Sequence, residues 1–343
     1  MSLSGDSKTR LSMGQLTVLG FMAGAYLAFA TTLAVVTSGG VEPLGIKKLI
    51  MGAVFPIGLI AIVIGGAELY TGNVMTAPVA AMTGRTSWGR VAYNWTVVYM
   101  GNFLGAFFVA YLIIRFTHIL PATFISDLQG IAVAKVSHPW WENFWRGFGC
   151  VWLVDLAIYL ASRVKEPVAK FFVVWFPAMA FFAIGFEHSI VNMFVIPAGI
   201  LAGAPISWSQ FLWSNLAPVT LGNTVAGLFM MGMLYWYVAG MPLLKPAGVS
   251  VTPSDQHAHP DYISAGNSHL LKVLMMGSAL SIAFTAFLPG VAGLIAFAVT
   301  TAGSPTGGSV FAAAPSLAAI APFLIGGYFI AVAVMATIAV RKR

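Results

Sequence analysis

The chain has 343 residues, of which 59% are hydrophobic and only 8% are charged, and its formal net charge is +7. A soluble domain carries about 25% charged residues, so the composition excludes a water-covered surface and predicts a membrane protein. The basic residues stand singly between apolar runs, which excludes a nucleic-acid-binding patch. The single cysteine, Cys150, excludes an internal disulfide.

Apolar stretches long enough to cross a bilayer, about 20 residues each, recur along the chain. The first follows Lys8 and Arg10 and lacks the short core and cleavage site of a removable signal, so it is predicted to be the first span. The six stretches of the predicted core are 14–38, 49–82, 91–116, 143–162, 171–203 and 211–238, and two more spans, 271–300 and 309–340, follow a polar segment. We therefore expect a pore domain in 1–240, a polar linker in 241–270 and a two-helix transmembrane extension in 271–343.

Orientation in the membrane follows from the Lys and Arg residues. Eight spans place both chain ends on one side, and that side holds most of the basic residues. Because an excess of Lys and Arg marks the cytoplasmic side, we expect a multi-pass protein of the cell (inner) membrane with both termini in the cytoplasm. Lys135 precedes the fourth span on the opposite side, where it either attracts anions or is an ordinary solvated lysine.

Two apolar stretches are interrupted by similar polar segments, 66–73 and 185–192. Glycine, glutamate and asparagine recur at the same spacing, and the next spans agree; the pairs are Gly66 with Gly185, Glu68 with Glu187, Asn73 with Asn192, Asn94 with Asn215, Gly101 with Gly222 and Asn102 with Asn223. Because three is an odd number of spans, the second copy of a three-span unit has the opposite orientation in the membrane. Inverted repeats with a broken helix in each half, and a solute site near the midplane between them, are a known arrangement in transporters. The fold class expected is an all-α membrane protein: a six-helix core of two inverted three-span repeats with broken second and fifth helices, plus two additional C-terminal transmembrane helices.

Several polar side chains at the breaks are candidates for function. His188 lies inside an apolar span, where it is either a proton donor or anion partner or a hydrogen-bonded residue that holds a broken helix together. Thr71 either bonds His188 across the repeat or caps the following half-helix. Asn223 is a candidate pore residue, although such amides also bond between helices.

The carboxylates at the breaks are expected to be structural. Glu68 and Glu187 would accept hydrogen bonds from backbone N–H groups freed where each helix breaks, and we assign Asn73 and Asn192 to the same role. A pair of pore carboxylates, with the buried acid Asp155 as a third, leaves open a proton-coupled cation transporter.

Apolar side chains close to the breaks are candidates for constrictions that exclude hydrated ions. Composition alone assigns the same residues to core packing. They are Phe55, Leu59 and Phe181 before the breaks, and Leu69 and Tyr70 within the first.

Three signatures resemble the formate/nitrite transporter family over residues 11 to 240. They are GAELYTGN at 66–73, GFEHSIVNMF at 185–194 and PVTLGN at 218–223, and WWENFWRGFGC at 140–150 looks most like the formate-channel branch. The resemblance implies an aquaporin-like six-helix protomer, a homopentamer with one pore through each protomer, and passage of formate, nitrite or hydrosulfide. The family's central histidine falls on His188, its loop threonine on Thr71, its sixth-span asparagine on Asn223, its vestibule lysine on Lys135, and its constriction residues on Phe55, Leu59, Phe181, Leu69 and Tyr70.

The chain also departs from the family. Tyr70 stands where phenylalanine is common, and Val151 and Asp155 stand where we expect asparagine and a small residue or cysteine. The last 100 or so residues have no counterpart, and we expect their two helices to pack outside the core without lining the pore.

These observations predict a channel or transporter for small monovalent anions, formate above all, with nitrite or hydrosulfide as alternatives. The resemblance implies that formate crosses as formic acid after proton transfer at the histidine. An enzyme is not expected, because one intramembrane histidine supplies neither a metal cluster nor a nucleophile with its base. No cofactor or metal is expected; the expected partners are the anion, the lipid bilayer and further copies of the chain.

Overall fold

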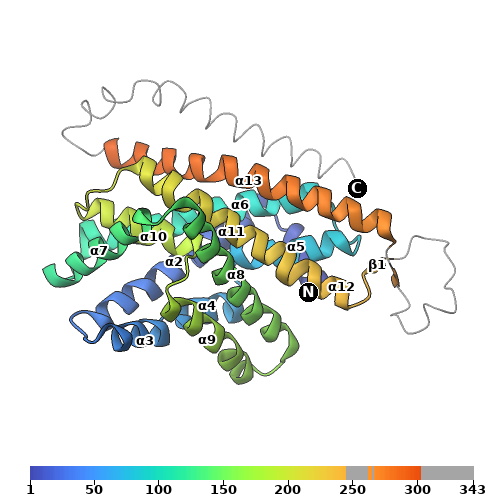
Figure 1. Cartoon of the computed structure of the whole chain (residues 1–343), viewed down its shortest axis with the longest axis horizontal. Helices are drawn as coiled ribbons and strands as arrows, with labels where there is room; N and C mark the ends of the chain where they lie inside the picture. Colours follow the sequence, from blue (N-terminus) through green and yellow to red (C-terminus); the bar gives the residue numbers. More distant parts are fainter. Residues whose placement is uncertain (245–261, 265, 303–343) are drawn as a thin grey trace.

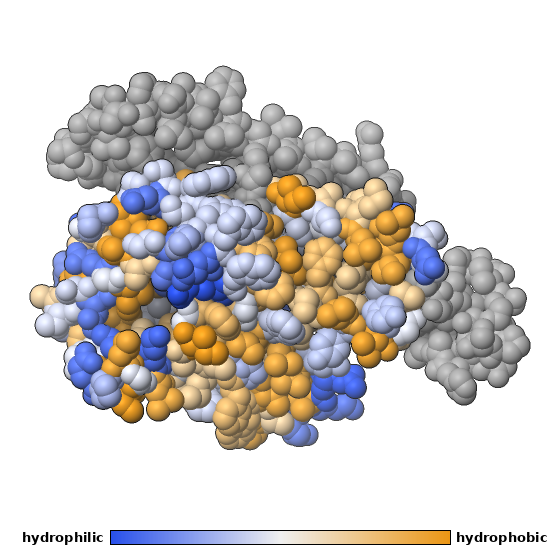
Figure 2. Space-filling model, viewed as in Figure 1, coloured by the Kyte–Doolittle hydropathy of each residue, from blue (hydrophilic) through white to orange (hydrophobic). Residues whose placement is uncertain are grey.

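The computed structural model describes residues 1–244, 262–264 and 266–302, and the side chains only as far as Phe284 in the last of these ranges. Within these ranges six helices or helix runs are long and apolar enough to cross a membrane: Met13–Ser38, Leu44–Met82, Trp88–Thr117, Trp140–Arg163, Pro167–Ile184 and Gln210–Val238. They lie within or close to the six predicted core spans, except that the fifth ends at Ile184 where a span of 171–203 was predicted. Broad apolar areas cover the middle of the face in Figure 2, where hydrophilic residues gather toward its two ends.

The first half of the core begins with a short helix, α1 (Ser2–Thr9), that the sequence reading did not predict. Helix α2 (Met13–Ser38) starts at a capping box in which Ser12 and Gln15 bond each other's backbone N–H groups. The broken span consists of α3 (Leu44–Val54), α4 (Pro56–Gly65) and α5 (Tyr70–Met82), and α6 (Trp88–Tyr111) continues as a π-helix, η1 (Leu112–Thr117). Helices α2 and α6 pack so closely that a Cβ at Gly105 would collide with the carbonyl of Phe21.

The second half has the same order of elements. A short helix, α7 (Ala122–Ser137), precedes α8 (Trp140–Arg163). The predicted span 171–203 is divided into α9 (Pro167–Ile184) and α10 (Ser189–Leu201), and the last core span consists of η2 (Gln210–Leu216), α11 (Ala217–Val225), η3 (Ala226–Met233) and α12 (Leu234–Val238).

The C-terminal extension is only partly described. The ends of the predicted linker form a two-stranded antiparallel sheet, β1 (Pro242–Leu244) with β2 (Tyr262–Ser264), in which Pro242 faces Ser264. The first predicted extra span falls within α13 (Asn267–Ala302), which is not among the six membrane-length helices found, and the second lies outside the described residues. Helix α13 packs on α11, α6 and η2, along the edge of the molecule opposite α3 and α9 (Figure 1).

Candidate functional site: two helix breaks and a buried histidine

The first break separates α4 from α5. Gly66 follows α4 with φ 79°, in the left-handed region that favours glycine, and the chain stays extended at Leu69 before α5 begins. The carboxylate of Glu68 accepts hydrogen bonds from Lys8 Nζ at 3.3 Å and from Asn73 Nδ2 at 2.7 Å. Asn73 also donates to Asn94 Oδ1 at 2.9 Å, and Asn94 donates to the Lys8 carbonyl at 3.1 Å.

The second break repeats this arrangement between α9 and α10. Gly185 has φ 89°, and Glu187 accepts from Lys135 Nζ at 2.9 and 3.0 Å and from Asn192 Nδ2 at 2.6 Å. Asn192 donates to Asn215 Oδ1 at 2.7 Å, and Asn215 donates to the Lys135 carbonyl at 2.9 Å. Each break is therefore held by one lysine, one glutamate and two asparagines.

A further amide braces the start of each half-helix. Asn102 Oδ1 accepts from the Tyr70 N–H, and Asn223 Oδ1 accepts from the Ser189 N–H, both at 2.9 Å. Each Nδ2 donates to two backbone carbonyls, one of them that of the break's glutamate. Because both ends of the Asn223 amide bond backbone groups, the geometry gives it a bracing role, and its predicted pore-lining role stays a prediction.

The two half-helices meet through Thr71 and His188. Thr71 Oγ1 lies 2.9 Å from His188 Nε2, and both residues are buried. His188 Nδ1 accepts from the Val191 N–H at 3.3 Å, so in a neutral ring the proton lies on Nε2 and is donated to Thr71. This contact is one of the two roles that the sequence left open for Thr71, and it directs the Nε2 proton of His188 toward the other half of the core.

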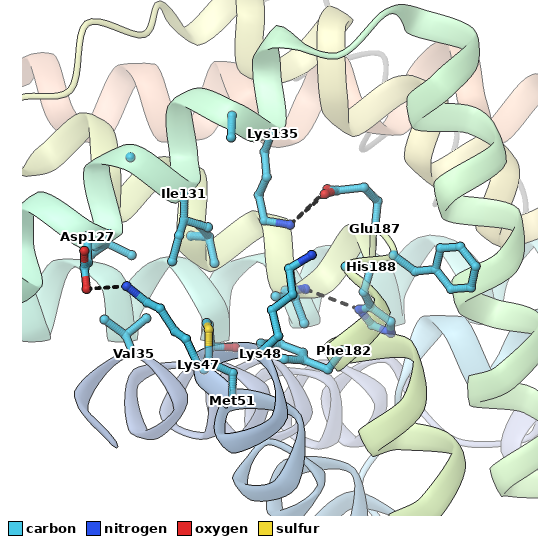
Figure 3. Close-up of a pocket in the computed structure, with 18 of the residues that line it drawn as sticks. Val35, Lys47, Lys48, Met51, Asp127, Ile131, Lys135, Phe182, Glu187 and His188 are labelled. Atoms are coloured by element: carbon cyan, nitrogen blue, oxygen red, sulfur yellow. Dashed lines mark hydrogen bonds and ion pairs between the residues drawn. The ribbon is translucent and has the colours of Figure 1, made fainter. Parts of the chain in front are cut away.

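A cavity of about 510 Å³ opens above the histidine, on the side of Lys135. Phe182, Glu187 and His188 lie together at one side of it (Figure 3), and Phe181 is also among its lining residues. The cations around it, from α3 and α7, are Lys47, Lys48 and Lys135. This cavity brings together the predicted lysine, the second glutamate and the histidine.

The three lysines differ in their partners. Lys135 is bound to Glu187, and Lys47 Nζ lies 2.8 Å from Asp127 Oδ2. Lys48 is exposed and has no acidic partner within ion-pair distance among the residues that the structure describes. Its ammonium is directed toward the break, because a Cβ at Gly185 would lie 3.9 Å from Lys48 Nζ. Lys48 is therefore the cavity's unneutralised cation, and the sequence reading did not single it out.

The predicted constriction residues fall into two groups. Phe55 meets Phe181 edge-on with ring centroids 5.4 Å apart, and Leu59 is buried in the same core. Tyr70 belongs to a different cluster: its ring contacts Trp95 and Tyr99, and its hydroxyl lies 2.7 Å from Thr224 Oγ1. Leu69 is buried directly before α5. Their roles as constrictions stay predictions.

Lys8 is a residue of the first break that the sequence did not single out. A signal was present, because Lys8 precedes Gly20 by the same number of residues as Lys135 precedes Gly147, and the two glycine carbonyls accept from Asn102 and Asn223. Asp155 takes no part in the hydrogen bonds of either break. It is fully buried in α8, where neither carboxylate oxygen has a hydrogen-bond partner among the described residues.

Two broken helices that meet at a buried polar site, inside a core of membrane-length helices, define a channel or transporter. The sequence profile described as Formate/nitrite transporter matches residues 1–237, and the chain belongs to this family. Among curated proteins it is 44% identical, over 68% of this chain and 91% of the other, to a "Probable formate transporter" of Methanothermobacter thermautotrophicus. It is 36% identical to the "Formate channel FocA" of Haemophilus influenzae, over 64% of this chain and 84% of the other.

Solved structures agree with this assignment. An "FNT family ion channel" superposes with a TM-score of 0.64 at 33% identity, over 69% of this chain and 96% of the other. A "Pentameric formate channel with formate bound" superposes with a TM-score of 0.62 at 30% identity, over 66% and 97%. The matched family is one of transporters, so the chain is a multi-pass membrane protein of that class.

Proposed function

We propose that the protein conducts formate, or a closely related small monovalent anion, and that the solute crosses the apolar core as its neutral acid. The observation that carries the proposal is the buried hydrogen bond between Thr71 and His188, at the inner end of a cavity with an unneutralised lysine. The names of the relatives support formate as the solute.

The first step of the proposed passage is the attraction of the anion into the cavity, and the charge at the cavity accounts for it. A bare anion loses many kcal/mol of hydration when it enters an apolar region, so it needs a cation to gather it and a proton to neutralise it. Lys48 supplies free positive charge, whereas the charge of Lys135 is compensated by Glu187.

The second step is the neutralisation of the anion by a proton, and the buried histidine supports it. Formate takes up one proton beside His188, passes the aromatic side chains of Phe55 and Phe181 as formic acid, and releases the proton on the other side. The proton comes from hydronium in the cavity by way of the His188 ring, which takes up this extra proton, passes it to formate and returns to its neutral form in each passage. Thr71 keeps the Nε2 proton directed across the break.

The alternative of a proton-coupled cation transporter has less support. Its two main carboxylates are each occupied by a lysine and an asparagine, Glu68 by Lys8 and Asn73 and Glu187 by Lys135 and Asn192. A carboxylate with its charge compensated in this way is a poor site for a metal cation or a second proton. Nitrite and hydrosulfide remain alternatives, because both are small monovalent anions with neutral acids.

The same proposal extends to assembly and topology. The matching bond networks of the two breaks support two inverted repeats, and the name of the pentameric neighbour supports a homopentamer. The distribution of basic residues supports a place in the inner membrane with both termini in the cytoplasm.

The test is flux through the purified protein in proteoliposomes. We expect formate to enter faster than acetate and far faster than sodium, and to enter faster as the pH falls. Nitrite and hydrosulfide are measured side by side with formate. Flux of sodium without formate would overturn the anion reading, and faster nitrite or hydrosulfide would replace formate as the solute.

A further inference from the structure

Helix α13 contacts the half-helix that carries Thr71 at its first turn. Phe284, which is 5% exposed, places its ring parallel to that of Tyr70 with centroids 6.2 Å apart. The same ring meets Trp95 edge-on at 5.3 Å. Tyr70 is the first residue of α5 and directly precedes Thr71, so an aromatic side chain of the extension packs one residue away from the partner of His188.

The first turn of α13 and the strand β1 hold the other end of α5. The last carbonyls of a helix have no partner within it, and two of them at the end of α5 accept hydrogen bonds from these two elements. The His269 ring N–H donates to the Met82 carbonyl at 2.9 Å, and the Leu244 N–H donates to the Thr83 carbonyl at 2.8 Å. Val273 of α13 joins Met82, Leu228 and Trp236 in a small buried cluster.

The opposite half-helix begins with Ser189 in place of Tyr70. It therefore offers no aromatic ring at this position for a side chain of α13 to pack on. The contacts of α13 with the first ring and the last carbonyl of α5 are the reason to assign it a role in the first half of the core.

We propose that helix α13 fixes the position of α5, and that Phe284 is a positioning residue that sets the solute selectivity of the pore through Tyr70 and Thr71. The proposal rests on the proposed anion conduction. It departs from the expectation that the extension packs outside the core without influence on the pathway.

The decisive variant is Phe284→Ala, with Ile282→Ala as its matched control. Ile282 lies on the same helix and is 66% exposed, so its truncation leaves the aromatic cluster intact. Because an aromatic pair contributes about 0.5–1.5 kcal/mol beyond burial, we expect the ratio of formate to acetate flux to fall by roughly two- to twelvefold in Phe284→Ala. A ratio of two fluxes does not depend on the amount of assembled protein, so a merely structural loss would leave it unchanged.

A second readout does not depend on transport. Hydrogen exchange of the amides of Tyr70 to Asn73 is expected to be faster in Phe284→Ala than in the wild type and in Ile282→Ala. Phe284→Leu, which keeps most of the apolar volume, serves in both measurements if the alanine variant does not assemble, and it is expected to show the same changes at smaller size.

The two hypotheses fail in different ways. A wild-type protein without formate flux would overturn the proposed function, and hydrogen exchange would still decide whether Phe284 holds α5. An unchanged flux ratio in a conducting Phe284 variant would overturn the selectivity role. Unchanged exchange at residues 70–73 would overturn the positioning role.

Discussion

At the first break the residue before the half-helix is Leu69, whereas at the second break it is His188. Around these two residues the scaffold is the same: a left-handed glycine, a lysine paired with a glutamate, two asparagines in the network and a third that braces the half-helix. The bracing asparagines among these shared residues form hydrogen bonds with backbone groups that each broken helix leaves without a helical partner, in surroundings of low dielectric constant. The two breaks differ at the position of Leu69 and His188, and only the histidine can carry a proton. The residues shared by both breaks therefore support the backbone, and the residue that differs is the candidate for chemistry.

The largest expected effect comes from removing one member of a buried ion pair. Lys135→Met leaves Glu187 without its cation, at a cost of about 3–5 kcal/mol, and we expect most of the assembled protein to be lost. The side chain of Lys8 is more exposed than that of Lys135, 24% against 14%, so Lys8→Met should cost less. Assembled protein is measured by gel filtration in detergent and by thermal unfolding.

The double variant Lys135→Met/Glu187→Gln is the control for this prediction. It removes both charges together and is expected to recover part of the assembled protein. If Lys135→Met assembled as well as the wild type, the ion pair would not be what holds the second break.

The next effect tests the difference between the breaks directly. His188→Leu gives the second break the residue of the first, and we expect normal assembly but a formate flux lower by about a hundredfold, the usual range for losing a proton-transfer group. His188→Asn keeps a polar side chain and is expected to flatten the pH dependence of flux. An assembled His188→Asn protein with the wild-type pH profile would argue against proton transfer at this residue.

The smallest effect concerns the cavity above the second break. Lys48→Gln removes its unneutralised cation, and we expect formate flux at low salt to fall by roughly two- to fivefold, since a single charge contributes only part of the field that steers an ion. The difference should shrink at high salt because the field is screened. Lys47→Gln is the matched control, because Lys47 is already paired with Asp127. An equal loss of flux in both variants would contradict the role of Lys48 in attracting the anion.

Much of the core was predictable because its signals are local. Six apolar stretches and the recurring Gly-Glu-Asn spacing indicate the spans and the two breaks, and the hydrogen bond of Thr71 to His188 was one of the two roles expected for Thr71. The short helices α1 and α7 were missed because they are too polar and too brief to resemble spans. Their lysines reach glutamates more than 50 residues away in sequence, and such a pairing leaves no periodic pattern.

The extension was harder to interpret for a different reason. Residues 273–284 are almost uniformly apolar, and uniform hydrophobicity indicates burial or lipid but not which face meets a neighbour. Nothing in that run distinguishes Phe284 from its neighbours until Tyr70 and Trp95 are seen beside it. The paired strands β1 and β2 were likewise hidden within a segment read as a polar linker.

The order of residues within each ion pair has a consequence for biosynthesis. In both halves the lysine precedes its glutamate, Lys8 by 60 residues and Lys135 by 52. A ribosome makes the N-terminal part first, so each base has been synthesised before the acid that it neutralises. As each broken segment enters the bilayer, the lysine that neutralises its carboxylate is already present in the nascent chain, whereas the bracing amides, Asn102 and Asn223, are made later.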